Sequence, residues 1–219
     1  FTIQNTCHKN YSMADPIEAE LLNYEEVDDI PAHDIKSEKK SKITKGYAAI
    51  HAAGFRDFLL NPEIMHALTD NAFEHPSEVQ QECIPYALLN SDIICQGKSG
   101  MGKTAIFVIS VLQQIDPVEG EVSCIVIANV RELAYQIAEE FNRFSKYMKN
   151  VRTAVIFGGI PRATHIQLLK DKKPNIIVST PGRLLDFVQS SKGKRPVIDV
   201  SHVKFFIIDE ADKVLESES

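Results

Sequence analysis

One stretch of the chain has the residue types and spacing of a phosphate-binding loop. Residues 97–104 match the pattern G-x-x-x-x-G-K-[ST] at every fixed position. Glycines let the backbone curl so that several N–H groups point at phosphate oxygens, and a following helix N-terminus adds a positive dipole end. Lys103 then reaches the outer phosphates, and the Thr104 hydroxyl binds Mg²⁺. The alternative is a chance glycine-rich turn. We predict these nucleotide-binding residues: Gly97, Lys98, Ser99, Gly100, Met101, Gly102, Lys103 and Thr104.

An acidic group follows an apolar run near the end of the chain. Residues 205–208 are Phe-Phe-Ile-Ile, and the next four are Asp209, Glu210, Ala211 and Asp212. A buried strand would deliver Asp209 to the carboxyl edge of a sheet, where ligands bind in open α/β folds. Asp209 would hold Mg²⁺ together with Thr104, and Glu210 would orient and deprotonate an attacking water. The alternative is a solvated acidic helix start.

From about residue 46 onward, helical patterns alternate with short apolar runs typical of strands, and these elements must position the residues above. The alternation predicts an α/β fold with a mostly parallel sheet and helices on both faces. Predicted strands are 92–96, 124–128, 153–157, 175–179 and 204–208. Helical patterns lie near 62–72, 78–90, 103–115, 131–147, 162–170 and 182–190.

Composition narrows the class of protein. Hydrophobic residues make up 44% of the 219, which suffices for a core. No apolar run approaches the roughly 18 residues that span a membrane. Four cysteines stand far apart without a CxxC pair, which argues against a zinc site or disulfide scaffold and suits a reducing compartment. A net charge of −6 gives no support to a nucleic-acid partner.

The first 45 residues have a different character from the rest. Residues 15–34 are acidic and 36–45 basic, with little apolar content, which predicts a disordered tail. The alternative is an interaction tail for a protein or RNA. Residues 1–12 show no pattern, and Met13 looks like a natural start, so we interpret 1–12 as upstream sequence or a tag. We divide the rest into a region at 46–81 and an α/β domain at 82–219.

The phosphate loop and the acidic group together resemble the DEAD-box RNA helicases. Residues 73–80 resemble the family's Q motif, whose glutamine, here Gln80, reads the adenine edge through its amide. Phe55 matches the family's upstream aromatic, which stacks near adenine; the alternative is a core phenylalanine. The resemblance implies a RecA-like phosphate-loop NTPase domain with ATP and Mg²⁺ as ligands.

Three further motifs resemble the family's RNA-contacting elements and occur in its order. Residues 131–134 resemble motif Ia, 158–159 the glycine pair and 180–183 motif Ib. In the family these grip sugar and phosphate, so the resemblance implies RNA binding with little sequence preference. For the two arginines the alternative is an ordinary salt bridge. The implied RNA-binding residues are Arg131, Gly158, Gly159, Thr180, Pro181, Gly182 and Arg183.

The resemblance extends to the nuclear subgroup of pre-mRNA splicing and mRNA export. It covers residues 13–219 and is most specific at 20–24, 46–60, 73–80, 98–104 and 143–148. It implies residence in the nucleus, secondarily the cytoplasm, and contact with an Aly-type export adaptor and a U2-associated splicing factor. The chain departs from the usual pattern with Gly97 for Ala, Val130 for Thr and Ala211 for Cys. Ala72 replaces a glycine, which matters if the backbone there needs a positive φ.

The acidic group lies close to Ser219, so the family's Ser-Ala-Thr motif and its second RecA-like domain with the arginine finger do not appear in this sequence. We therefore expect this chain, as given, to bind ATP weakly and neither to hydrolyse it fast nor to unwind RNA. Two hypotheses stay open: the ATP-binding half of an RNA helicase, and an inactive interaction module that competes with the full-length helicase. Gln80 and residues 180–183 argue against a nucleotide kinase or DNA motor.

Overall fold

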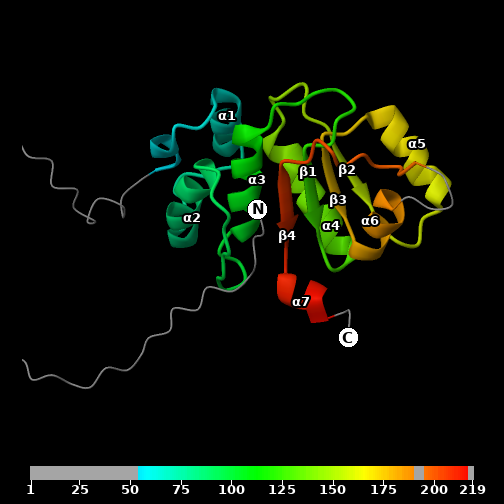
Figure 1. The fold of residues 1–219 in the computed structure, drawn as a ribbon. Helices are drawn as coiled ribbons and strands as arrows, with labels where there is room; N and C mark the ends of the chain where they lie inside the picture. The colour runs from blue at the N-terminus through cyan, green and yellow to red at the C-terminus, as the bar shows by residue number, and fades with distance from the viewer. Residues whose placement is uncertain (1–53, 190–194, 217–219) are drawn as a thin grey trace, which may run out of the picture. The chain divides into compact units, whose positions relative to one another are not determined.

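The structure is a computed structural model that describes residues 54–189 and 195–216. Four parallel strands form one sheet in the order β2-β3-β1-β4 (Figure 1). The strands are β1 (Cys124–Ile127), β2 (Thr153–Ile156), β3 (Ile176–Ser179) and β4 (Phe205–Ile208). The helices are η2 (Phe55–Phe58, 3-10), α1 (Pro62–Asp70), α2 (Glu78–Leu88), α3 (Lys103–Gln114), α4 (Arg131–Phe144), α5 (Arg162–Lys172), α6 (Pro181–Val188) and α7 (Ala211–Glu216). The predicted tail at 1–45 lies outside the described residues.

Alternate residues of each strand face two separate hydrophobic cores, because side chains of a strand point to opposite faces in turn. In β1, Cys124 and Val126 pack with side chains of α3 and α4, whereas Ile125 packs with Leu184 and Phe187 of α6. Since both faces are buried, the strands read as continuous apolar runs. The prediction of a parallel sheet with helices on both faces is confirmed (Figure 1).

The parallel register sets where the connecting segments begin. Ile127 at the end of β1 pairs with Ser179 at the end of β3 and with Ile208 at the end of β4. Ile156 at the end of β2 is level with Ser179 as well. The four segments that follow the strands therefore leave from one edge of the sheet, which brings their side chains into one region.

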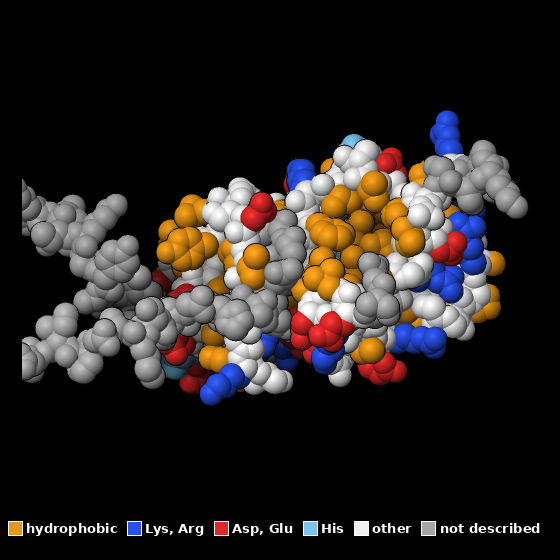
Figure 2. All heavy atoms as spheres, turned by 60° about the horizontal axis from the view of Figure 1, so that its bottom comes forward, with side chains coloured by type: hydrophobic (Ala, Val, Ile, Leu, Met, Phe, Trp, Pro, Cys, Tyr) orange, Lys and Arg blue, Asp and Glu red, His pale blue; other side chains and the backbone are white. Residues whose placement is uncertain are grey.

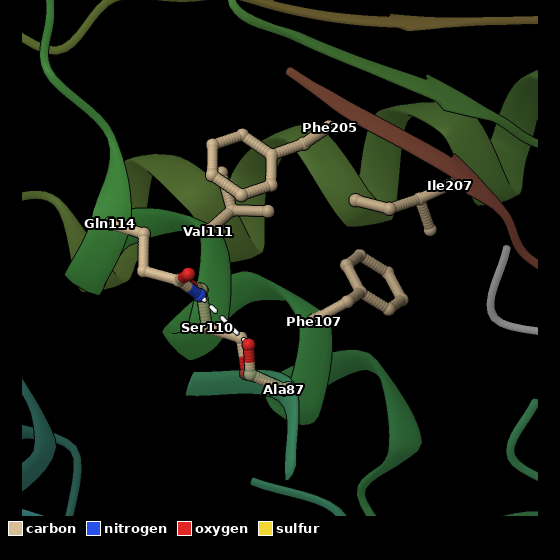
Figure 3. Close-up of a pocket in the computed structure, with 7 residues that line it drawn as sticks. All are labelled: Ala87, Phe107, Ser110, Val111, Gln114, Phe205 and Ile207. Carbon is tan, nitrogen blue, oxygen red and sulfur yellow. Dashed lines mark hydrogen bonds between the residues drawn. The ribbon is translucent and has the colours of Figure 1, made fainter. Parts of the chain in front are cut away.

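The predicted strand at 92–96 is wrong: these residues are not part of the sheet. A narrow apolar cavity lies between α3 and β4 and is lined by Phe107, Val111, Phe205 and Ile207 among others (Figure 3). A second cavity, of about 490 Å³, lies between Asp92 and the start of β4. An apolar run that has no hydrogen-bonded neighbour forms no ladder, however strand-like its composition.

The β4 side of the sheet also exposes apolar surface. β4 pairs with β1 on one side, and no other described strand pairs with it. Large hydrophobic side chains are exposed on β4, before it and in α7, at Phe206, Val200 and Leu215. Figure 2 shows a broad group of hydrophobic side chains on the molecular surface. An exposed edge strand with apolar neighbours favours association with another polypeptide strand.

Ala72, at the end of the first helical region, has a φ of 56°. The backbone at this position is therefore left-handed, and the motif that this segment resembles has glycine there. The replacement of that glycine by Ala72 thus matters for the conformation of the chain. A non-glycine residue in this conformation costs about 1–2 kcal/mol. The neighbouring Phe73 packs edge-on against Phe144 of α4, with ring centroids 5.3 Å apart.

The second core encloses one buried titratable side chain, His165 of α5. Its ring is 3% exposed and lies edge-on to Phe157 and Phe187, with centroids 5.9 and 6.2 Å away. Its Nδ1 atom has no hydrogen-bond partner among the described residues. Burial, aided by the positive charge of Arg183, lowers the pKa of His165 below its ordinary value.

We expect His165 to make the fold acid-sensitive. Because its folded-state pKa is lowered, the unfolded chain takes up a proton first as pH falls through about 6.5, and stability is lost over that range. His165→Leu should show a smaller fall in melting temperature between neutral and mildly acidic pH. His202→Gln, at a half-exposed histidine near Glu121, is the control for loss of a histidine at the surface. Parallel wild-type and His165→Leu pH profiles would contradict this assignment.

Candidate functional site

The predicted phosphate loop turns directly into α3. Gly100 and Gly102 have φ values of 84° and 72°, the left-handed region that glycine adopts without strain. Gly102 is the N-cap of α3, and Lys103 and Thr104 form its first turn. The backbone N–H groups of such a first turn lack helical acceptors, so they are suited to bind an anion.

Lys103 lies across the loop. Its Nζ donates to the carbonyl oxygens of Gly97 at 2.7 Å and Lys98 at 2.9 Å. These bonds hold the ammonium group over the loop. A phosphate on the loop would therefore meet a positive charge together with the helix N-terminus.

A single cleft of about 750 Å³ joins the loop to the acidic group. Lys103, Thr104, Asp209 and Glu210 all line it, although the two pairs are far apart in the sequence. Asp212 and residues of the loop complete this wall. The structure thus brings together the residues that the sequence analysis predicted to act on phosphate and metal, and the roles of the individual side chains stay predictions.

Asp209 is a nearly buried carboxyl group, 8% exposed. Burial raises its pKa, while the Glu210 N–H, which donates to Oδ1 at 3.0 Å, and the charge of Lys103 oppose the rise. A desolvated carboxylate is stabilised by a cation brought next to it. Asp209 is therefore a favourable place for a divalent ion to bind.

Glu210 has a strained backbone, with a φ of 49°. Its side chain accepts a hydrogen bond from Lys213 Nζ at 2.9 Å. Non-glycine residues in the left-handed region cost free energy and are found disproportionately at functional sites. This conformation accompanies the turn from β4 into α7, which leaves Glu210 on the wall of the cleft.

Thr104 and Asp209 offer Mg²⁺ the oxygen ligands that it prefers. Among the described residues, no group of three or more His, Cys, Asp and Glu side chains is placed to hold a metal alone. Mg²⁺ commonly binds through one or two protein oxygens, with phosphate and water completing the shell. The donor set of the cleft fits an ion that arrives together with a nucleotide.

Gln80 is bonded to the phosphate loop through its side-chain amide. It is 4% exposed, its Nε2 donates to Gly102 O at 3.0 Å, and its Oε1 accepts from Ser77 N at 2.9 Å. The amide keeps one N–H and one lone pair for another partner. Its reading of an adenine edge stays a prediction.

Ser77 is a supporting residue to which the sequence analysis gave no role. Its Oγ donates to Met101 O at 2.9 Å and accepts from Gln80 N at 3.3 Å, so it caps α2 and holds the loop at once. The spacing S-x-x-Q is a capping box that the sequence does display. The signal for the cap was present, but its contact with Met101 required the fold.

Phe55 is a core residue in this structure. Its ring is 2% exposed and packs edge-on against Phe58 and Phe73, with centroids 6.0 and 6.1 Å away. It also lines a cavity of about 580 Å³ beside the cleft, and Phe73 lines both. The stacking of Phe55 near adenine stays a prediction.

One face of α4 forms a wall of the cleft that the sequence analysis missed. The Arg143 guanidinium lies 5.5 Å from the Phe73 ring centroid and 4.9 Å from that of Phe144. The helical spacing was visible, but the cleft to which this face turns depends on packing. The α4 residues that line the cleft are Leu133, Gln136, Ile137, Glu140 and Arg143.

The predicted RNA-contacting segments follow β1, β2 and β3. A Cβ atom at Gly159, which has a φ of 88°, would lie 2.6 Å from Arg131 Nη1. Arg183 donates to Ile160 O at 2.8 Å, and its guanidinium lies 5.5 Å from the centroid of Phe187. Within residues 54–189 and 195–216, neither arginine forms a salt bridge. The fold therefore gathers two arginines around one glycine loop, although RNA contact itself stays a prediction.

Two glycine variants separate the loop's backbone conformation from its contact with Gln80. Both Gly100→Ala and Gly102→Ala place a Cβ at a positive φ. At Gly102 the Cβ would also collide with Gln80 Nε2, whereas at Gly100 nothing lies within 4 Å. We expect Gly102→Ala to be the less stable by a further 1–3 kcal/mol or so in denaturant unfolding. Equal losses would show that Gln80 does not restrain the loop.

A family model of the DEAD/DEAH box helicases matches residues 77–219. The chain is 51% identical to the ATP-dependent RNA helicase uap56 of Schizosaccharomyces pombe, over 90% of this chain and 48% of that protein. It is 50% identical to the DEAD-box ATP-dependent RNA helicase 15 of Arabidopsis thaliana, over 91% of this chain and 46% of that one. The chain spans about half the length of these relatives.

Solved structures show the same fold. A DEAD box protein from Methanococcus jannaschii superposes with a TM-score of 0.68 at 34% identity, over 75% of this chain and 43% of that one. A hypothetical ATP-dependent RNA helicase from Sulfolobus tokodaii gives 0.63 at 34% identity, over 73% and 44%. With the RecA-like fold, the phosphate loop and the Asp-Glu-Ala-Asp group in one cleft, the chain belongs to the DEAD/DEAH box helicase family.

Proposed function

We propose that this chain is the ATP-binding part of an ATP-dependent RNA helicase, whose ATP hydrolysis is stimulated by RNA. The observation that carries the proposal is the shared carboxyl edge of β1–β4. From that edge, β4 leads into the acidic wall of the phosphate cleft, while β1, β2 and β3 lead to the arginine and glycine segments. Relatives that are half identical are named as ATP-dependent RNA helicases.

For ATP, the residues of the cleft divide the work. The loop N–H groups and Lys103 bind the outer phosphates, and Thr104 with Asp209 hold Mg²⁺. When bound, Mg²⁺ neutralises charge on the phosphate oxygens. Glu210 accepts a proton from water at its carboxylate, which a hydrogen bond from Lys213 Nζ holds in place. Gln80 binds the adenine edge through the amide N–H and the oxygen lone pair that Gly102 and Ser77 leave available.

For RNA, the partner is the sugar–phosphate backbone. Arg131 and Arg183 supply charged donors, and Gly158, Gly159 and the start of α6 at Thr180–Gly182 supply backbone N–H groups. Such contacts carry little base preference. They also let a chain of net charge −6 bind RNA, because the donors are concentrated in one place.

A nuclear role in pre-mRNA splicing and mRNA export is the finer form of this proposal. It rests on the subgroup resemblance in the sequence and on 51% identity to a relative named uap56. An Aly-type export adaptor and a U2-associated splicing factor are the partners it implies. No described helix is long and apolar enough to cross a membrane.

Two substitutions test the nucleotide chemistry. Lys103→Ala should weaken binding of a fluorescent ATP analogue with Mg²⁺ about tenfold or more, because a charged phosphate contact is lost. Glu210→Gln should bind the analogue like wild type but lose roughly a hundredfold in RNA-stimulated ATP turnover. Turnover is measured on this chain in the presence of RNA. If wild type and both variants are equally inactive, the chain is an interaction module.

A second pair of variants tests the RNA surface. Gly159→Ala would displace the Arg131 guanidinium, whereas Gly158→Ala meets nothing within 4 Å. We expect Gly159→Ala to lower affinity for a fluorescent single-stranded RNA about tenfold at low salt, as loss of one charged contact predicts. Gly158→Ala should bind RNA like wild type, and ATP binding should be unchanged in both. Equal RNA affinities for the two variants would exclude Arg131 from the RNA surface.

A further inference from the structure

Two cysteines from different elements meet beneath the phosphate loop. Cys83 belongs to α2, and Cys95 lies in the segment that leads into the loop. The Cys83 Sγ donates a hydrogen bond to Cys95 Sγ at 3.5 Å. They stand twelve positions apart in the chain, so the pair has no CxxC spacing. The fold has thus made a pair of neighbouring thiols from two cysteines that the sequence analysis treated as isolated.

The surroundings of the pair favour the reactive thiolate form. The hydrogen bond from Cys83 lowers the pKa of Cys95 to about 7, and the positive charge of Lys103 assists, while burial opposes the shift. Cys124 is the contrast: it lies wholly buried in β1, and burial raises its pKa. The thiolate is the attacking form in disulfide exchange.

The pair also has a route to a reagent. Cys83 is partly exposed, whereas Cys95 is 2% exposed. A dissolved disulfide therefore reaches Cys83 first, and Cys95 is the partner that resolves the product. A disulfide needs the two sulfurs about 2.05 Å apart, so the pair must close from its 3.5 Å separation.

A disulfide between Cys83 and Cys95 would displace the phosphate loop through two sets of contacts. Cys83 lies three residues after Gln80, so both project from one side of α2. Gln80 Nε2 is bonded to Gly102 O in the loop. Cys95 lies two residues before Gly97, whose carbonyl holds Lys103 Nζ at 2.7 Å. A covalent link between α2 and this segment would shift the groups that Gly97 and Gly102 hold in register.

We propose that Cys83 and Cys95 form a dithiol site that low-molecular-weight disulfides oxidise, and that the resulting disulfide weakens nucleotide binding by the adjoining loop. Cys83 passes its thiol proton to the neighbouring Cys95 thiolate, attacks the reagent, forms a mixed disulfide and releases one thiolate, which takes the proton back from Cys95. The Cys95 thiolate then attacks Cys83 Sγ, closes the Cys83–Cys95 bond and releases the second. Two protein thiols lose two electrons and two protons, and the reagent disulfide becomes two thiols.

The dithiol chemistry stands on the cysteines alone, whereas its effect on binding rests on the proposed nucleotide function. The test uses the full chain with Cys7→Ser, so that the three cysteines of the described region remain. The protein is equilibrated with oxidised and reduced glutathione, its thiols are alkylated, and peptides are analysed by mass spectrometry without reduction. Affinity for a fluorescent ATP analogue is measured on the same samples.

We expect a peptide pair joined through Cys83 and Cys95, reversed by dithiothreitol, with the analogue bound at least about fivefold more weakly. Cys83→Ser and Cys95→Ser should each abolish the effect of oxidant, and Cys83→Ser should keep the affinity of the reduced protein. Glutathione retained on Cys83 without the cross-link would overturn the dithiol site. A cross-link with unchanged affinity would overturn its coupling to the loop. If the reduced protein fails to bind the analogue, the proposed nucleotide function fails, and the cross-link still decides the dithiol.

Discussion

The parallel pairing of β1 with β3 and β4 is the constraint on which the rest of this structure depends. It places the ends of these strands level, with Ile127 opposite Ser179 and Ile208. Each following segment then starts from the same edge, and each carries a different chemistry. A register shift of one residue would turn the buried side chains of a strand to the opposite core and move Asp209 with them. The strand register therefore fixes both the packing of the cores and the geometry of the site.

The phosphate loop is held by its neighbours as much as by its own glycines. Gln80 and Ser77 bond to the carbonyls of Gly102 and Met101, and both side chains belong to the start of α2. The same helix carries Cys83 to Cys95. A change in α2 thus reaches the loop through several short contacts. Side chains outside the loop therefore hold its carbonyl groups in place.

The acidic wall of the cleft combines a desolvated carboxyl group with a strained backbone. Asp209 is desolvated, and burial raises its pKa despite the opposing Glu210 N–H and the charge of Lys103. Glu210 holds a left-handed backbone next to it. Both features cost stability in the folded protein and suit binding of a cation and polarisation of water. The two well-packed cores on either side of the sheet supply the stability that offsets these costs.

Local sequence patterns were enough to predict the fold class, four of the five expected strands and the phosphate-loop and acidic residues that line the cleft. They were enough because buried parallel strands and phosphate loops have short local signatures. They did not determine that residues 92–96 stay outside the sheet, because pairing depends on distant neighbours. The core position of Phe55, the α4 wall of the cleft and the contact of Arg131 with Gly159 became visible only in the folded chain. The tertiary structure alone also brought Cys83 to Cys95, because contacts between elements follow from packing, which no local pattern records.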